Sequence, residues 1–85
     1  MRREIVELHG RVQGVGFRAT VADIARRHAV HGSVVNLRSG GVEIDAEGDD
    51  EILEGFIQDV LQHPPRWARI EDIKRTPAEP RGVRG

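Results

Sequence analysis

The residues best suited to chemistry in this chain lie between positions 10 and 18. The segment Gly10-Arg11-Val12-Gln13-Gly14-Val15-Gly16-Phe17-Arg18 places three glycines within seven positions, and an arginine follows. Glycine-rich backbone at the start of a helix can point several N–H groups at one spot, which then attracts an anion. An arginine at the same place can bind two oxygens of that anion at once. The segment therefore predicts an oxyanion site, most simply for phosphate.

Arg18 favours this interpretation over a plain glycine turn, which the glycines alone would allow equally well. Its charge opposes the positive end of the predicted helix dipole, so it is unfavourable unless an anion compensates it. A conflict of this kind between a local rule and the sequence is typical of a functional site. The segment is not a Walker A loop, because no Lys-Ser or Lys-Thr pair follows, and Ala19 leaves only a shortened dinucleotide fingerprint.

Hydrophobic periodicity predicts the elements that position this segment. Alternation of apolar and polar residues predicts strands over residues 4–9, 33–38, 42–47 and about 68–75. Helical spacing of apolar residues predicts helices over 17–29 and from Asp49-Asp50 to near His63, with glycine and proline at their ends. Gly32 is expected to end the first helix, and Ser39-Gly40-Gly41 to form a tight hairpin turn. The last strand is expected to contain a bulge, because its two isoleucines, Ile70 and Ile73, are three positions apart.

The order strand-helix-strand-strand-helix-strand predicts an α+β fold of the ferredoxin-like βαββαβ type. In that fold an antiparallel sheet carries two helices on one face. A length of 85 residues allows one domain, residues 1–85, whose Pro-, Gly- and Arg-rich end (77–85) is expected to be a loose tail. This order puts the Gly10–Arg18 segment between the first strand and the first helix, with Asn36 on the next strand.

Composition excludes several classes of function. The 13 basic and 14 acidic residues nearly cancel, so bulk charge gives no reason to expect binding to nucleic acid or to a membrane surface. The first residues lack the apolar run of a signal peptide or a membrane span. The chain has no cysteine, which excludes disulfides and thiolate metal sites and fits a cytoplasmic location. The four histidines show no ligand spacing, so we expect neither a metal nor a cofactor.

Two stretches together resemble the signature of the acylphosphatase family. They are Val12–Arg18, and Gly32-Ser33-Val34-Val35-Asn36-Leu37 followed by residues 41–48; the resemblance extends over about residues 4–75. It implies that Arg18 binds phosphate and that Asn36 positions a water molecule, as the catalytic residues. It also implies that the loop formed by Gln13, Gly14, Val15, Gly16 and Phe17 cradles the phosphate together with Arg18.

The resemblance implies an enzyme that hydrolyses acyl phosphates to a carboxylate and inorganic phosphate without a metal or a covalent intermediate. An isolated Asn36 would more simply be a strand residue that satisfies backbone groups near a hairpin. The alternative function is a non-catalytic phosphate- or carbamoyl-phosphate-binding module, like the acylphosphatase-like domain of hydrogenase-maturation carbamoyltransferases. An RNA-binding version of the fold is disfavoured, because residues 5–9 and 42–47 contain no aromatic residue to stack on bases.

The sequence departs from the family pattern in two places. Thr20 stands where an aromatic residue is common, which affects local packing. The family also ends on a short fifth strand, for which only Val83 offers a comparable residue here. We therefore expect the edge beside residues 33–38 to be uncovered, with reduced stability or an edge-strand dimer as the consequence. A monomer is otherwise expected.

The remaining polar and aromatic residues have ordinary structural interpretations. Glu43, Asp45 and Glu47 are expected to form a solvated strand face, and His28 and His31 to lie on the surface near a helix end. Trp67 is expected to close the core after Pro65.

Overall fold

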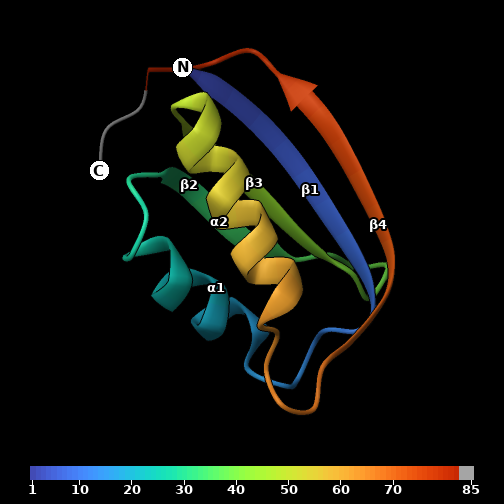
Figure 1. Cartoon of the computed structure of the whole chain (residues 1–85). Coiled ribbons are helices and arrows are strands. Elements are labelled where there is room, and N and C mark those ends of the chain that lie inside the picture. The colour runs from blue at the N-terminus through green and yellow to red at the C-terminus, as the bar shows by residue number, and fades with distance from the viewer. Residues whose placement is uncertain (83–85) are drawn as a thin grey trace.

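Residues 1–82, the part of the chain that the computed structural model describes, contain four strands and two helices. They are β1 (Arg2–Arg11), α1 (Phe17–Ala25), β2 (His31–Asn36), β3 (Val42–Gly48), α2 (Asp50–Gln62) and β4 (Arg69–Ala78). The strands form one sheet in the order β2-β3-β1-β4, with every neighbouring pair antiparallel. Both helices cover the same face of this sheet (Figure 1). The predicted ferredoxin-like α+β fold is confirmed.

The core lies between the two helices and the sheet face that they cover. Strand alternation turns one set of side chains toward the helices, and the helical repeat turns one stripe of each helix toward the sheet. The buried apolar side chains are Val6, Leu8, Val12, Phe17, Val21, Ile24, Val42, Ile44, Ala46, Leu53, Phe56, Ile57 and Val60. Val12 and Phe17 belong to this set, so the glycine loop between them is anchored in the core at both ends.

The first helix is shorter than expected, because α1 ends at Ala25 and not at residue 29. The N–H of Arg27 donates to the carbonyl of Ile24, and the N–H of His28 donates to that of Ala25. These bonds span three residues and belong to a tighter turn than the α-helix. The second helix ends before His63, as Pro64-Pro65 predicted.

His28 is half-buried and connects the two helices, whereas it was expected on the surface. Its Nε2 donates to Asp59 Oδ2 on α2 at 3.0 Å. Its ring also packs edge-on against Phe56, with the ring centroids 6.0 Å apart. The sequence does not reveal these contacts, because Asp59 and Phe56 lie on α2, about thirty positions further along the chain.

Gly32 lies inside β2 and does not end the first helix, so that expectation is wrong. Its φ is +151°, and a Cβ atom built there would lie 1.7 Å from the carbonyl oxygen of Asp45. Glycine is needed at this position because the backbones of β2 and β3 approach too closely for a side chain. The strand consequently begins at His31 and ends at Asn36, two residues earlier at each end than the predicted range 33–38.

The bulge expected in the last strand is confirmed. His9 pairs with Asp72 and Gly10 pairs with Ile70, so Glu71 is the additional residue on β4. The strand continues to Ala78, however, and therefore includes two residues of the predicted tail. The backbone N–H groups of Arg81 and Gly82 then donate to the carboxylate of Glu47, at 2.8 and 2.7 Å. Val83, the residue considered for a fifth strand, lies outside the described residues.

Candidate active site

The start of α1 has the backbone geometry that the glycine segment predicts. Gly14 has a φ of +72°, and Gly16, which occupies the N-cap position of α1, has a φ of +80°. Both values lie in the left-handed region that glycine adopts readily. No side chain caps α1, and its first turn contains no acidic residue. The N–H groups of this turn therefore lack a side-chain acceptor and are suited to bind an anion.

A cavity of about 200 Å³ opens at this end of α1. It is lined by the β1–α1 loop, the first turn of α1 and the last residue of β2, through Val12, Gly14, Gly16, Phe17, Arg18, Ala19 and Asn36. Drug-sized ligands generally occupy about 300–1,000 Å³, so this cavity suits a small ligand or one end of a larger one. The fold thus brings five of the predicted site residues together: Gly14, Gly16, Phe17, Arg18 and Asn36.

Arg18 and Asn36 both line this cavity, and both carry polar side chains. Asn36 pairs with the buried Val42, and directly opposed residues share a sheet face, so Asn36 lies on the face that the helices cover. Within residues 1–82, Arg18 forms no ion pair and the Asn36 amide forms no hydrogen bond. The guanidinium offers five N–H donors, and the amide offers both donors and an acceptor. These groups can therefore hold an anion and a water molecule.

Two predicted loop residues, Gln13 and Val15, do not line the cavity. Gln13 Nε2 donates to the carbonyl oxygens of Leu37 and Gly41, at 2.7 and 2.8 Å, and so ties the loop to the β2–β3 hairpin. Val15 packs against the core. An isolated Asn36 was expected to satisfy backbone groups near the hairpin. In the structure Gln13 does this instead. The sequence offered no signal for this pairing, since the hairpin follows twenty-four positions later.

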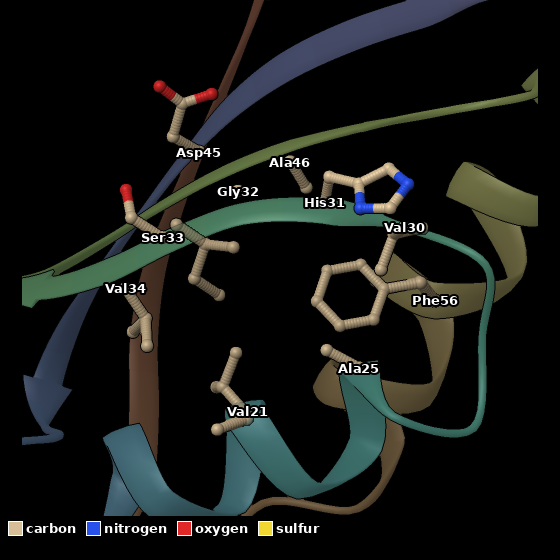
Figure 2. Close-up of a pocket in the computed structure, with 12 residues that line it drawn as sticks. Val21, Ala25, Val30, His31, Gly32, Ser33, Val34, Asp45, Ala46 and Phe56 are labelled. Atoms are coloured by element: carbon tan, nitrogen blue, oxygen red, sulfur yellow. The ribbon is translucent and has the colours of Figure 1, made fainter. Parts of the chain in front are cut away.

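Another hollow, of about 210 Å³, lies between α1 and β2 and is mainly apolar (Figure 2). Val21, Ala25 and Phe56 face it from the helices, and Val30 and Val34 face it from the β2 side. Asp45 is at its rim and points away from the helices in Figure 2. This hollow lacks the convergent polar groups of a catalytic site, so the cavity at Arg18 is the better candidate.

Asp45 and Glu47 are not solvated, contrary to expectation. Arg3 Nε and Nη2 donate to the two carboxylate oxygens of Asp45, at 2.9 and 2.8 Å, and these bonds lower the pKa of Asp45. Glu47 is only 3% exposed, and the N–H groups of Arg81 and Gly82 lower its pKa. The chain after β4 covers this part of the open sheet face, which strand alternation alone could not reveal.

The described residues hold neither a candidate metal site nor a helix that could cross a membrane. Among residues 1–82, no three or more His, Cys, Asp or Glu side chains are grouped so that they could hold a metal ion. None of the helices in that range is long and apolar enough to cross a membrane.

The fold and the cavity define the class: a small ferredoxin-like domain with a candidate anion site at the start of its first helix. The acylphosphatase family model matches residues 5–85. An acylphosphatase of Thermococcus kodakarensis is 43% identical over 83 residues, which are 98% of this chain and 90% of that protein. The crystal structure of acylphosphatase from Bacillus subtilis covers 100% of this chain and 91% of its own, with 35% identity and a TM-score of 0.87.

The chain belongs to the acylphosphatase family, as the motifs around Arg18 and Asn36 predicted. Full-length HypF in its phosphate- and nucleotide-bound form is also similar, with 32% identity and a TM-score of 0.90. That match covers 95% of this chain but only 11% of HypF. The acylphosphatases of similar length therefore support the assignment of this chain as an acylphosphatase hydrolase.

Proposed function

We propose that the cavity at the start of α1 binds the phosphoryl group of a small acyl phosphate and that Arg18 and Asn36 promote its hydrolysis. The products are a carboxylate and inorganic phosphate. One observation carries this proposal: Arg18, Asn36 and the uncapped start of α1 line the same cavity. Family membership supports the same reaction.

The roles follow from the chemistry of each group. Arg18 and the N–H groups of the loop from Gln13 to Phe17 bind the non-bridging phosphoryl oxygens and offset their charge, which is the main requirement of phosphoryl transfer. The side chains of Gln13 and Val15 serve by holding that loop in place. Asn36 accepts a hydrogen bond from the attacking water and donates one to a phosphoryl oxygen.

In this mechanism the reaction needs no general acid, metal or cofactor. Water attacks phosphorus, the bond from phosphorus to the carboxyl oxygen breaks, and the electron pair leaves with the carboxylate. A carboxylate is a good leaving group, so it requires no proton from the protein. The phosphate itself can take the proton of the water.

A non-catalytic phosphate- or carbamoyl-phosphate-binding module is the second candidate, and the similarity to part of HypF favours it. Hydrolysis of benzoyl phosphate separates the two functions. We expect Arg18→Ala and Asn36→Ala each to lower kcat/KM by about 10²–10³-fold, the loss that follows removal of one transition-state donor. Arg27→Ala, an exposed arginine in the turn after α1, is the matched control and should keep the full rate.

Phosphate binding measured by calorimetry completes this experiment. Arg18→Ala should weaken phosphate binding strongly, because it removes a charged donor. Asn36→Ala should weaken binding less, because Asn36 gives the phosphoryl group one neutral hydrogen bond and its main proposed role concerns the water. A wild-type chain that binds phosphate but does not hydrolyse benzoyl phosphate would be the binding module. Full activity of Asn36→Ala would refute the water-positioning role, and loss of activity in EDTA would refute the metal-free mechanism.

We also propose that the chain acts in the cytoplasm as a monomer and without nucleic acid. The absence of cysteine supports the location, and the near balance of 13 basic and 14 acidic residues supports the absence of nucleic acid. Cell fractionation tests the location, light scattering of the purified chain tests the oligomeric state, and a gel-shift assay tests for nucleic-acid binding.

A further inference from the structure

A third hollow, of about 430 Å³, lies where the end of β1 meets the segment that joins α2 to β4. It is lined by Arg11, Arg66, Trp67, Ala68, Arg69 and Glu71. Trp67 was expected to close the core, but it is 66% exposed, and Ala68 packs against the core in its place. The sequence prediction for Trp67 is therefore wrong, and a large aromatic ring is left at a hollow that the catalytic proposal does not use.

Three arginines line this hollow: Arg11, Arg66 and Arg69. Arg11 and Arg69 are directly opposed in the β1–β4 ladder, where like charges destabilise a sheet. Within residues 1–82 neither these two nor Arg66 forms an ion pair, whereas Arg2, Arg3 and Arg75 each do. Glu71 supplies one negative charge to the lining against three positive ones. An external anion would resolve this excess of positive charge.

The aromatic ring indicates what else the anionic ligand contains. The Arg66 guanidinium carbon lies over the Trp67 ring, 5.1 Å from its centroid, in the geometry of a cation–π contact. Exposed tryptophan rings and guanidinium planes are surfaces on which nucleobases stack. Guanidinium groups such as those of Arg11 and Arg69 bind phosphate oxygens in pairs of hydrogen bonds. A planar ring joined to phosphate therefore complements both parts of the hollow.

We infer that this hollow binds a nucleoside phosphate, with the base on Trp67 and Arg66 and the phosphates on Arg11 and Arg69. The site shares no lining residue with the cavity at Arg18. Its Arg11 nevertheless directly precedes Val12, which lines that cavity, and the segments after β1 and after α2 lie at the same end of the molecule (Figure 1). The ligand would thus sit beside the catalytic loop, whether or not that loop is active.

Trp67 is the only tryptophan and the chain has no tyrosine, so intrinsic fluorescence reports on this hollow alone. We expect adenosine diphosphate to change the fluorescence of the wild-type chain in a saturable way. The double variant Arg11→Ala/Arg69→Ala should raise the Kd by at least about tenfold, because it removes the two proposed phosphate contacts. Arg26→Ala/Arg27→Ala removes the same charge from exposed positions after α1 and should leave the Kd unchanged.

Any of the following would overturn the inference: the absence of a saturable change, an unchanged Kd in the Arg11→Ala/Arg69→Ala variant, or a change that disappears in Arg18→Ala. Equal affinity for inorganic phosphate would overturn the assignment to nucleoside phosphates. Thermal melts show whether the double variant folds; relief of the Arg11–Arg69 repulsion predicts no loss of Tm. Calorimetry of Trp67→Ala with the same nucleotide gives a second measurement, in which binding should weaken.

Discussion

At the scale of single residues, Gln13 connects the proposed phosphate-binding loop to the strand that carries Asn36. Its side-chain amide donates to the carbonyls of Leu37 and Gly41, which flank the turn after β2. Arg18 and Asn36 come from different elements, so their separation depends on how the loop is held against that hairpin. We therefore propose that the Gln13 side chain positions the loop, whose backbone N–H groups are the proposed phosphate donors.

Replacing Gln13 tests this role. Gln13→Ala removes two hydrogen bonds of a half-buried side chain, so we expect a loss of about 1–3 kcal/mol in the free energy of unfolding. We also expect a lower kcat with benzoyl phosphate, because Asn36 and the loop lose their common support. Urea denaturation and steady-state kinetics measure the two effects. Gln58→Ala is the matched control, since within residues 1–82 the Gln58 side chain bonds only to Glu54, on the exposed side of α2. A Gln13 variant as active as this control would contradict the role.

The candidate site residues could be predicted from the sequence more completely than the residues that hold them in place. Arg18 conflicts with the helix dipole, and that conflict is visible in the sequence alone. Asn36 became a candidate through the resemblance of two motifs. The hydrogen bonds of Gln13 and the exposure of Trp67 depend on which loops lie next to each other in the fold. A local sequence pattern does not contain that information.

At the scale of elements, a cluster of four charged residues joins α2 to the strands β1 and β4. Glu4, on the helix-covered face of β1, is 4% exposed and accepts hydrogen bonds from Arg75 and Arg2. Arg75 Nη2 also donates to Glu54 Oε1 on α2, at 2.7 Å. The Arg75 guanidinium lowers the pKa of Glu4 and lowers that of Glu54 from 4.5 to about 2. Arg75 thus bridges the sheet edge and the helix.

The cluster predicts how stability depends on pH. A carboxylate whose pKa is lower in the folded chain stabilises it above the ordinary value of 4.5, and this contribution is lost as the pH falls toward 2. Arg75→Gln should lower the free energy of unfolding at pH 7 by about 1–3 kcal/mol, chiefly through the buried Glu4, since the exposed pair with Glu54 is screened by solvent. It should also flatten the decline between pH 4.5 and 2.

Urea denaturation across that pH range measures both effects. Lys74→Gln removes a neighbouring charge on the same strand that forms no ion pair within residues 1–82, and it should change neither quantity. An Arg75 variant with the pH profile of the wild type would contradict the assigned bridge.

Element types could be predicted well, and element ends less well. The apolar periods of α2 and β3 coincide with the observed elements because both are strongly amphipathic. The end of α1 and the start of β2 were misplaced, because Gly32 was interpreted as a helix breaker. Its actual role, a close approach to the backbone of Asp45, exists only once β2 and β3 have paired.

At the scale of the whole molecule, the two edges of the described sheet differ in how they resist pairing with another chain. The β4 edge carries Lys74, Arg75, Pro77 and the bulge at Glu71, all of which discourage strand addition. Residues 31–36 of β2 contain no charged residue of the Asp, Glu, Lys or Arg type and no proline. The apolar hollow of Figure 2 also opens beside this strand. The β2 edge is therefore the place where self-association would begin.

We predict a monomer in dilute solution and a weak dimer at high protein concentration, formed by antiparallel pairing of two β2 strands about a twofold axis. The Tm should then rise with protein concentration. Val35→Lys should abolish that rise, because a lysine on an edge strand opposes pairing. Ile73→Lys is the matched control on β4, since Val35 and Ile73 are 43% and 44% exposed, and it should keep the concentration dependence. Light scattering measures the dimer directly; a high Tm that is independent of concentration would show instead that the β2 edge is protected.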